Sequence, residues 1–166
     1  VKFNTDEWVY NPGIPSNAFE IKSDKFENVS NTIKEIVTTN KVNAVVAKDW
    51  TTQEWVYFIR NFPTDITPEQ MALIDNAFDL TNSKNSHKAM VWYEQAINHN
   101  YKGNNVDMKI EEFLTRVGRR WYVSTLYKAF ANADKVDEGM AIYKKARSNY
   151  HSVTVNTIDE VLGYKE

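Results

Sequence analysis

Apolar residues recur at helical spacing through most of the chain, and no stretch shows the strict alternation of a half-buried strand. Phe26, Val29 and Ile33 illustrate this spacing, as do Met71 and Ile74. About eight segments of roughly 8 to 16 residues follow it, joined by short polar turns. The pattern predicts an all-α domain of stacked antiparallel helix pairs, because each amphipathic helix must bury one face against a neighbour. No repeat period is visible in the residues, so only the helix–turn–helix rhythm indicates stacking.

Residues with known capping preferences predict where the helices begin and end. Thr51 and Glu54 have the spacing of a capping box. Thr67, Pro68 and Gln70 provide an N-cap, a proline in the first turn and the far end of a second box. The expected helices run from Ser23 past Val37, from Thr51 to before Pro63, from Thr67 through Phe78, from Asn85 or Ser86 through Ile97, from Val106 to Val117, from Val123 through Phe130, through Met140 to Arg147, and from Thr154 to Val161, with Gly163 ending the last.

Residues 115–130, TRVGRRWYVSTLYKAF, place a glycine, two adjacent arginines and several aromatic residues between two helical patterns. Gly118 stands where the first helix would need a left-handed residue just after its end. Arg119 and Arg120 then fall at a sharp turn, where a rigid frame can direct a guanidinium toward a carboxylate or phosphate. The alternative is that both arginines cap carbonyl groups or lie in solvent. We take this segment as the functional centre.

The first 22 residues show no helical period and contain Pro12, Gly13 and Pro15. Because proline restricts its own backbone and that of the preceding residue, residues 1–22 are expected to be an extended segment lying on another surface. Residues 23–166 are expected to form the helical domain. The expected anchors of the extended segment are Trp8, Val9, Tyr10, Ile14 and Phe19.

Composition excludes several classes of function. The net charge of -2 gives no general electrostatic reason to bind nucleic acid or an acidic membrane surface. No apolar run approaches the roughly 20 residues of a membrane span. The absence of cysteine removes disulfides, thiol catalysis and thiolate metal sites, but leaves the compartment open between cytoplasm and periplasm.

The residues supply no complete metal or nucleophile site. The three histidines, His87, His99 and His151, include no H-E-x-x-H pattern, so a zinc site of that kind cannot be built from this chain alone. Residues 134–145 begin like a calcium loop, but lysine occupies the last position, where the loop needs a bidentate glutamate. There is also no glycine-rich phosphate loop and no G-x-S-x-G elbow. Each histidine is therefore expected to be a structural or surface residue, and no cofactor is expected within the chain.

Four sequence patterns, in the correct order and at similar spacing, resemble the C-terminal helical domain of leukotriene A4 hydrolase and its bacterial aminopeptidase relatives. They are the W-x-Y-x-P-G-[LI]-P linker that leaves the catalytic domain, the N-[SA]-E-I-x-x-R-W helix start, the G-R-x-K-[FY]-x-x-P-L-[YF]-[KR] segment and a closing H-P-[VI]-T. The matching residues are, in turn, Trp8, Tyr10, Pro12, Gly13, Ile14 and Pro15; Asn85, Ser86 and Trp92; Gly118, Arg119, Tyr122, Leu126, Tyr127 and Lys128; and Tyr143, Arg147, Tyr150, His151, Val153 and Thr154.

The chain departs from these patterns at several positions. His87 replaces a glutamate and Val91 an arginine, Trp121 replaces a lysine, and Thr125 and Ser152 replace prolines. In the family that lysine helps to bind the substrate carboxylate. Its replacement puts epoxide-hydrolase activity on leukotriene in doubt more than it does aminopeptidase activity.

The resemblance implies a right-handed α-α superhelix of the armadillo or HEAT kind, which packs beside a thermolysin-like zinc domain and forms one wall of the substrate cleft. Arg119 aligns with the arginine that contacts the carboxylate of the family's substrates, and Trp121 is a second candidate substrate-binding residue. Arg120 carries no family role. The zinc ligands, the glutamate base and the tyrosine that stabilises the transition state would lie upstream, so the chain alone is expected to be inactive. Its expected partners are its own upstream catalytic domain and peptide substrates.

A free-standing helical scaffold that binds a protein partner on its concave face is the alternative function. The sequence upstream would separate the two hypotheses. An H-E-x-x-H followed by a glutamate about 20 residues later is the arrangement that such a zinc site requires.

Overall fold

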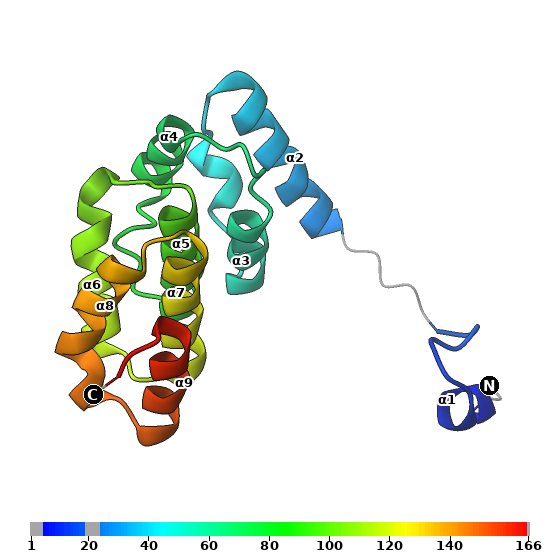
Figure 1. The fold of residues 1–166 in the computed structure, drawn as a ribbon. Helices are drawn as coiled ribbons and strands as arrows, with labels where there is room; N and C mark the ends of the chain where they lie inside the picture. Colours follow the sequence, from blue (N-terminus) through cyan, green and yellow to red (C-terminus); the bar gives the residue numbers. More distant parts are fainter. Residues whose placement is uncertain (1–4, 19–23, 166) are drawn as a thin grey trace.

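The computed structural model describes residues 5–18 and 24–165, and within these ranges every regular element is helical. Figure 1 shows how the helices follow one another along the chain. The elements are α1 (Asp6–Tyr10), α2 (Asp24–Thr39), η1 (Ala44–Ala47), α3 (Thr52–Arg60), α4 (Pro68–Phe78), α5 (Ser86–Asn98), η2 (Gly103–Asn105), α6 (Val106–Arg116), α7 (Arg120–Asn132), α8 (Val136–Ala146), η3 (Arg147–Asn149) and α9 (Ser152–Leu162).

Helices α3, α5, α7 and α9 form one row, in which each helix packs against the next, while α6 packs against α8 in a second layer. Contacts between helix starts show that α3, α5 and α7 begin at a common edge. The Asn85 amide nitrogen donates to the Thr52 hydroxyl at 3.1 Å, and the rings of His87 and Trp121 lie 4.8 Å apart. The prediction of an all-α superhelix of stacked helix pairs is confirmed.

The predicted caps explain why the helices begin where they do. Both predicted capping boxes are present, one between Thr51 and Glu54 and one between Thr67 and Gln70. In each box the threonine side chain accepts from the backbone amide of the later residue, and the later side chain accepts from the threonine backbone amide. The Asn85 side chain accepts from the first free amides of α5. Gly163 ends α9 in the left-handed conformation, with φ of 66°. The eight predicted helices correspond to α2 through α9, although Ser23, the expected cap of the first, lies outside the described residues.

The prediction for Gly118 is wrong. Helix α6 ends at Val117, whose backbone is extended (φ -98°, ψ 117°), and Gly118 is not among the residues with positive φ. Arg119 is extended as well (φ -68°, ψ 114°), so the connection from α6 to α7 uses extended backbone and no left-handed residue. Asparagine and aspartate tolerate the left-handed region, and they occupy it elsewhere in the described chain, at Asn40, Asp79, Asn100, Asn104, Asn105 and Asp134.

The prediction for the N-terminal segment is wrong in two respects. Residues 6–10 form a short helix, and the side chains of Trp8 and Tyr10 are exposed rather than anchored. Hydrogen bonds join the two ends of the described part of the segment. The Glu7 carboxylate accepts from the backbone amide and the hydroxyl of Ser16, and the Trp8 indole donates to the Asn17 side chain. Figure 1 shows it apart from the helical layers. Phe19, the last expected anchor, lies outside the described residues.

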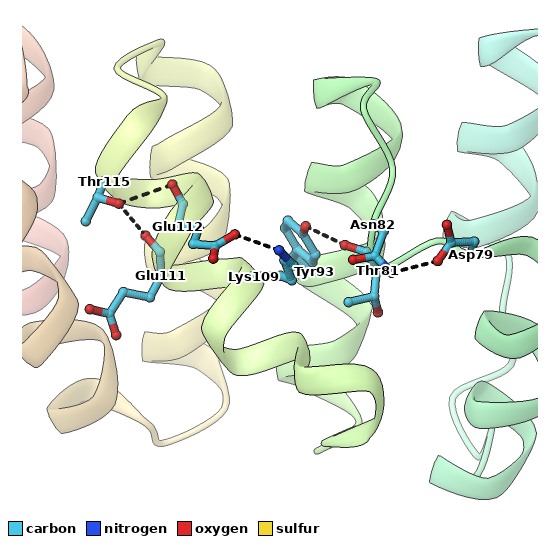
Figure 2. Close-up of polar contacts among 8 residues, drawn as sticks. All are labelled: Asp79, Thr81, Asn82, Tyr93, Lys109, Glu111, Glu112 and Thr115. Carbon is cyan, nitrogen blue, oxygen red and sulfur yellow. Dashed lines mark hydrogen bonds and ion pairs between the residues drawn. The ribbon is translucent and has the colours of Figure 1, made fainter.

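A buried carboxylate organises the connection between α4 and α5. Asp75 is 1% exposed and accepts hydrogen bonds from the Thr81 backbone amide (2.8 Å) and hydroxyl (2.6 Å). It also accepts from the Tyr101 hydroxyl (2.9 Å) and from the Asn104 side-chain amide (2.8 Å). The Tyr93 hydroxyl donates to the Thr81 carbonyl oxygen, as Figure 2 shows. These contacts fix the loop that leads into α5, and with it the edge at which the candidate site lies.

Candidate substrate-carboxylate site

Arg119 occupies the N-cap position of α7, at the edge where α3, α5 and α7 begin. Its carbonyl oxygen accepts from the amides of Tyr122 (3.0 Å) and Val123 (3.2 Å), which fixes its backbone. Its side chain makes no capping hydrogen bond. The structure therefore places Arg119 in the connection between α6 and α7, as the sequence predicts, and Arg120 in the first position of α7.

The Arg119 guanidinium is exposed and forms no hydrogen bond or ion pair with any described residue. It lies instead over aromatic rings, with its central carbon 5.2 Å from the Tyr122 ring centre and 6.0 Å from that of Trp121. A guanidinium held by ring faces keeps its N–H groups available. It can therefore form a forked pair with a carboxylate.

Trp121 projects beside this guanidinium and is 44% exposed. Its ring meets the His87 ring edge-on, and lies tilted against the Tyr122 ring at 5.2 Å between centres. His87 Nε2 is buried without a hydrogen-bond partner among the described residues. Burial lowers the pKa of His87, and the charges of Arg60 and Arg119 lower it further, so the imidazole is neutral at neutral pH. His87 is therefore a packing partner of the indole.

A pocket of about 410 Å³ opens beside these side chains, between α7 and α9. The Arg120 Nε donates to the Thr157 hydroxyl at 3.0 Å, whereas the Arg119 guanidinium has no hydrogen-bond partner among the described residues. The described residues that line the pocket include no acidic side chain, which gives the pocket a positive character suited to an anion. Its lining residues are Arg119, Arg120, Trp121, Ser124, Lys128 and Thr157.

A second, smaller pocket of about 190 Å³ lies between the α4–α5 loop and α6, in the region of Figure 2. Lys109 and Glu112 on its wall pair with each other at 2.9 Å, and Tyr93 is committed to the Thr81 carbonyl oxygen. Burial raises the pKa of Tyr93 to about 12, which keeps its hydroxyl protonated. These groups are partnered internally, so this pocket offers less to a ligand than the pocket at Arg119.

The sequence predicted Arg119 and Trp121 as candidate site residues but did not predict the ring contacts that hold them. Tyr122 lies under the guanidinium and His87 lies against the indole. The position of Tyr122 in the resemblance pattern was a signal for the first contact. Nothing in the local spacing signals the second, because it joins two helices that are distant in the sequence.

No group of three or more histidine, cysteine, aspartate or glutamate side chains within residues 5–18 and 24–165 could hold a metal ion. In the same residues no helix combines the length and apolar character that crossing a membrane requires.

The fold and the geometry together define a superhelical domain whose α7 start carries exposed cationic and aromatic side chains. The family model described as "Leukotriene A4 hydrolase, C-terminal" matches residues 50–162, and the chain belongs to this family.

Individual relatives agree with this assignment. A leukotriene A-4 hydrolase homolog of Botryotinia fuckeliana is 26% identical over 95% of this chain and 24% of its own length. Leucine aminopeptidase 2 of Ajellomyces capsulatus is 25% identical over 91% of this chain and 25% of its own length. The structure of native yeast LTA4 hydrolase superposes with a TM-score of 0.78 at 17% identity, covering 98% of this chain and 29% of that one. The chain thus spans about a quarter of the length of these curated relatives.

Proposed function

We propose that this chain is the C-terminal domain of a zinc-dependent aminopeptidase, in which it forms one wall of the substrate cleft and Arg119 binds the carboxylate of the peptide. The family assignment supports a domain of a larger hydrolase, and one of the relatives is named a leucine aminopeptidase. Residues 1–22 would then be the linker from the catalytic domain and residues 23–166 the helical domain. The zinc and its ligands would belong to the upstream part.

The observation that carries the proposal is the state of the Arg119 guanidinium. It is exposed, held over the Tyr122 ring, and has no acidic partner among the described residues. A charge-assisted pair with a carboxylate stabilises a complex by about 1.5 to 3 kcal/mol. Arginine also fixes the orientation of the carboxylate, because its donors form a planar fork.

The experiment that tests this function compares the longer gene product with the 166-residue chain. Purified longer protein should contain about one zinc ion and hydrolyse aminoacyl anilides, and a chelator should remove both properties. The chain alone should be folded and helical by circular dichroism but should do neither.

The contrary result would be a longer protein that binds no zinc and cleaves no aminoacyl substrate. That outcome would favour the alternative, a helical scaffold for a protein partner. Zinc-dependent turnover by the 166-residue chain, after controls for contaminating protease, would also contradict the proposal.

A further inference from the structure

We propose that Trp121 makes the carboxylate site selective for a carboxyl-terminal residue with an aromatic or large aliphatic side chain. This inference rests on the proposed function, since it assumes that Arg119 binds the carboxylate. Its basis is that an exposed indole lies within 6.0 Å of the guanidinium, at the mouth of one shared pocket.

The indole is held in place before any ligand arrives. His87 contacts it edge-on at 4.8 Å and Tyr122 lies against it at 5.2 Å. The Trp121 carbonyl oxygen also accepts from the Thr125 hydroxyl at 2.9 Å, within the first turns of α7. A ring fixed by neighbours loses little conformational freedom when a ligand packs against it, so its contact contributes more to affinity.

The connectivity of an amino acid brings the two contacts together. The carboxylate carbon and the Cβ atom are both bonded to Cα, so a carboxylate on Arg119 places the side chain a few bonds away, within reach of a ring centred 6.0 Å from the guanidinium carbon. Among the described residues, Trp121 is the only apolar side chain that lines this pocket. A phenyl or leucyl group can therefore bury area against the indole, whereas a methyl group cannot.

The remaining cations refine this selectivity. Arg120 and Lys128 line the same pocket, so a basic carboxyl-terminal side chain would face like charges. An acidic carboxyl-terminal side chain would gain little affinity from these cations. Arg120 already donates to Thr157, Lys128 is exposed, and pairs between exposed charges contribute little in water. The expected order of affinity is therefore aromatic and large aliphatic first, then small, then basic.

Binding to the full 166-residue chain tests this order directly, and it is independent of catalysis. The probes are N-acetyl-L-phenylalanine, N-acetyl-L-alanine and N-acetyl-L-phenylalaninamide, titrated while the backbone amide resonances, which every variant retains, are followed by NMR. The variants are Trp121→Ala, Trp121→Leu and Arg119→Ala. Trp8→Ala is the matched control, because Trp8 is also an exposed indole, 58% exposed, but belongs to the N-terminal segment.

Wild-type protein and the Trp8→Ala variant should bind the phenylalanine probe about tenfold more tightly than the alanine probe, which corresponds to about 1.4 kcal/mol. Trp121→Ala should reduce the ratio of the two affinities, phenylalanine probe to alanine probe, to about one, and Trp121→Leu should restore part of the preference. Arg119→Ala should weaken the binding of both free acids to the level of N-acetyl-L-phenylalaninamide, which has no carboxylate.

Two results would overturn the selectivity. One is equal binding of the two free acids by the wild type, and the other is a ratio that persists in both Trp121 variants. If Arg119→Ala still abolished the preference for acid over amide in either case, the proposed function would stand and only the selectivity would fall. If neither free acid bound better than the amide, both would fall.

Discussion

Replacing Asp75 by alanine should destabilise the protein more than any exposed substitution, because four donors would lose their acceptor at once. The carboxylate is 1% exposed and serves the Thr81 amide and hydroxyl, the Tyr101 hydroxyl and the Asn104 amide at 2.6 to 2.9 Å. Hydrogen bonds to a charged group contribute about 1.5 to 3 kcal/mol each, and members of one network are not additive. A loss of about 3 to 5 kcal/mol is therefore expected.

Urea unfolding followed by circular dichroism measures this loss. With a slope of about 2 kcal/mol per molar urea, the midpoint should fall by about 1.5 to 2.5 M. Asp79→Asn is the matched control. Asp79 is an exposed aspartate at the end of α4 whose left-handed backbone suits asparagine, so its midpoint should change by less than about 0.3 M. A shift for Asp75→Ala no larger than that of the control would refute the reasoning.

Three other predictions concern the folded state. Gly139→Ala should lower the melting temperature although alanine is the better helix former, because a Cβ there would lie 3.0 Å from the Cβ of Phe130. A melting temperature at or above that of the wild type, measured by calorimetry, would contradict the expected clash. Thr51→Ala should cost about 1 kcal/mol in urea unfolding by opening the capping box, and a loss below about 0.3 kcal/mol would show that water replaces the contact. Burial and two nearby arginines lower the pKa of His87, so below about pH 6.5 the unfolded chain binds more protons than the folded chain. The free energy of unfolding should therefore fall as the pH is lowered toward 5, and His87→Gln should make this fall less steep. An equally steep fall in the variant would contradict the lowered pKa of His87.

The sequence predicted the features of the fold that are set within one turn of helix. The boxes at Thr51 and Thr67 and the Asn85 cap depend on residues three or fewer positions apart, and all are present. Gly118 shows the limit of such local reasoning. A glycine after a helix permits a left-handed end, but the chain at Val117 continues in an extended conformation.

The site was predictable only in part for the same reason. The position of Arg119 between two helices follows from the helical patterns on either side of it, and its proposed role follows from the resemblance. The support for its neighbour Trp121 comes from His87 on α5, and the packing of α5 against α7 brings these two residues together. A pairing between distant helices depends on how the helices stack, which no short window of sequence contains.

The most direct test of the account is the ratio of kcat/KM on a tripeptide to kcat/KM on an aminoacyl anilide, measured in the longer aminopeptidase of which we propose this chain is a domain. The anilide lacks a free carboxylate, so only the tripeptide can pair with Arg119. Arg119→Ala should lower the ratio about 10- to 150-fold, which corresponds to about 1.5 to 3 kcal/mol, and Arg119→Lys should restore part of it. Arg120→Ala, at an arginine already bonded to Thr157, should leave the ratio unchanged. A ratio that is the same in Arg119→Ala and wild type would contradict the claim that Arg119 binds the substrate carboxylate.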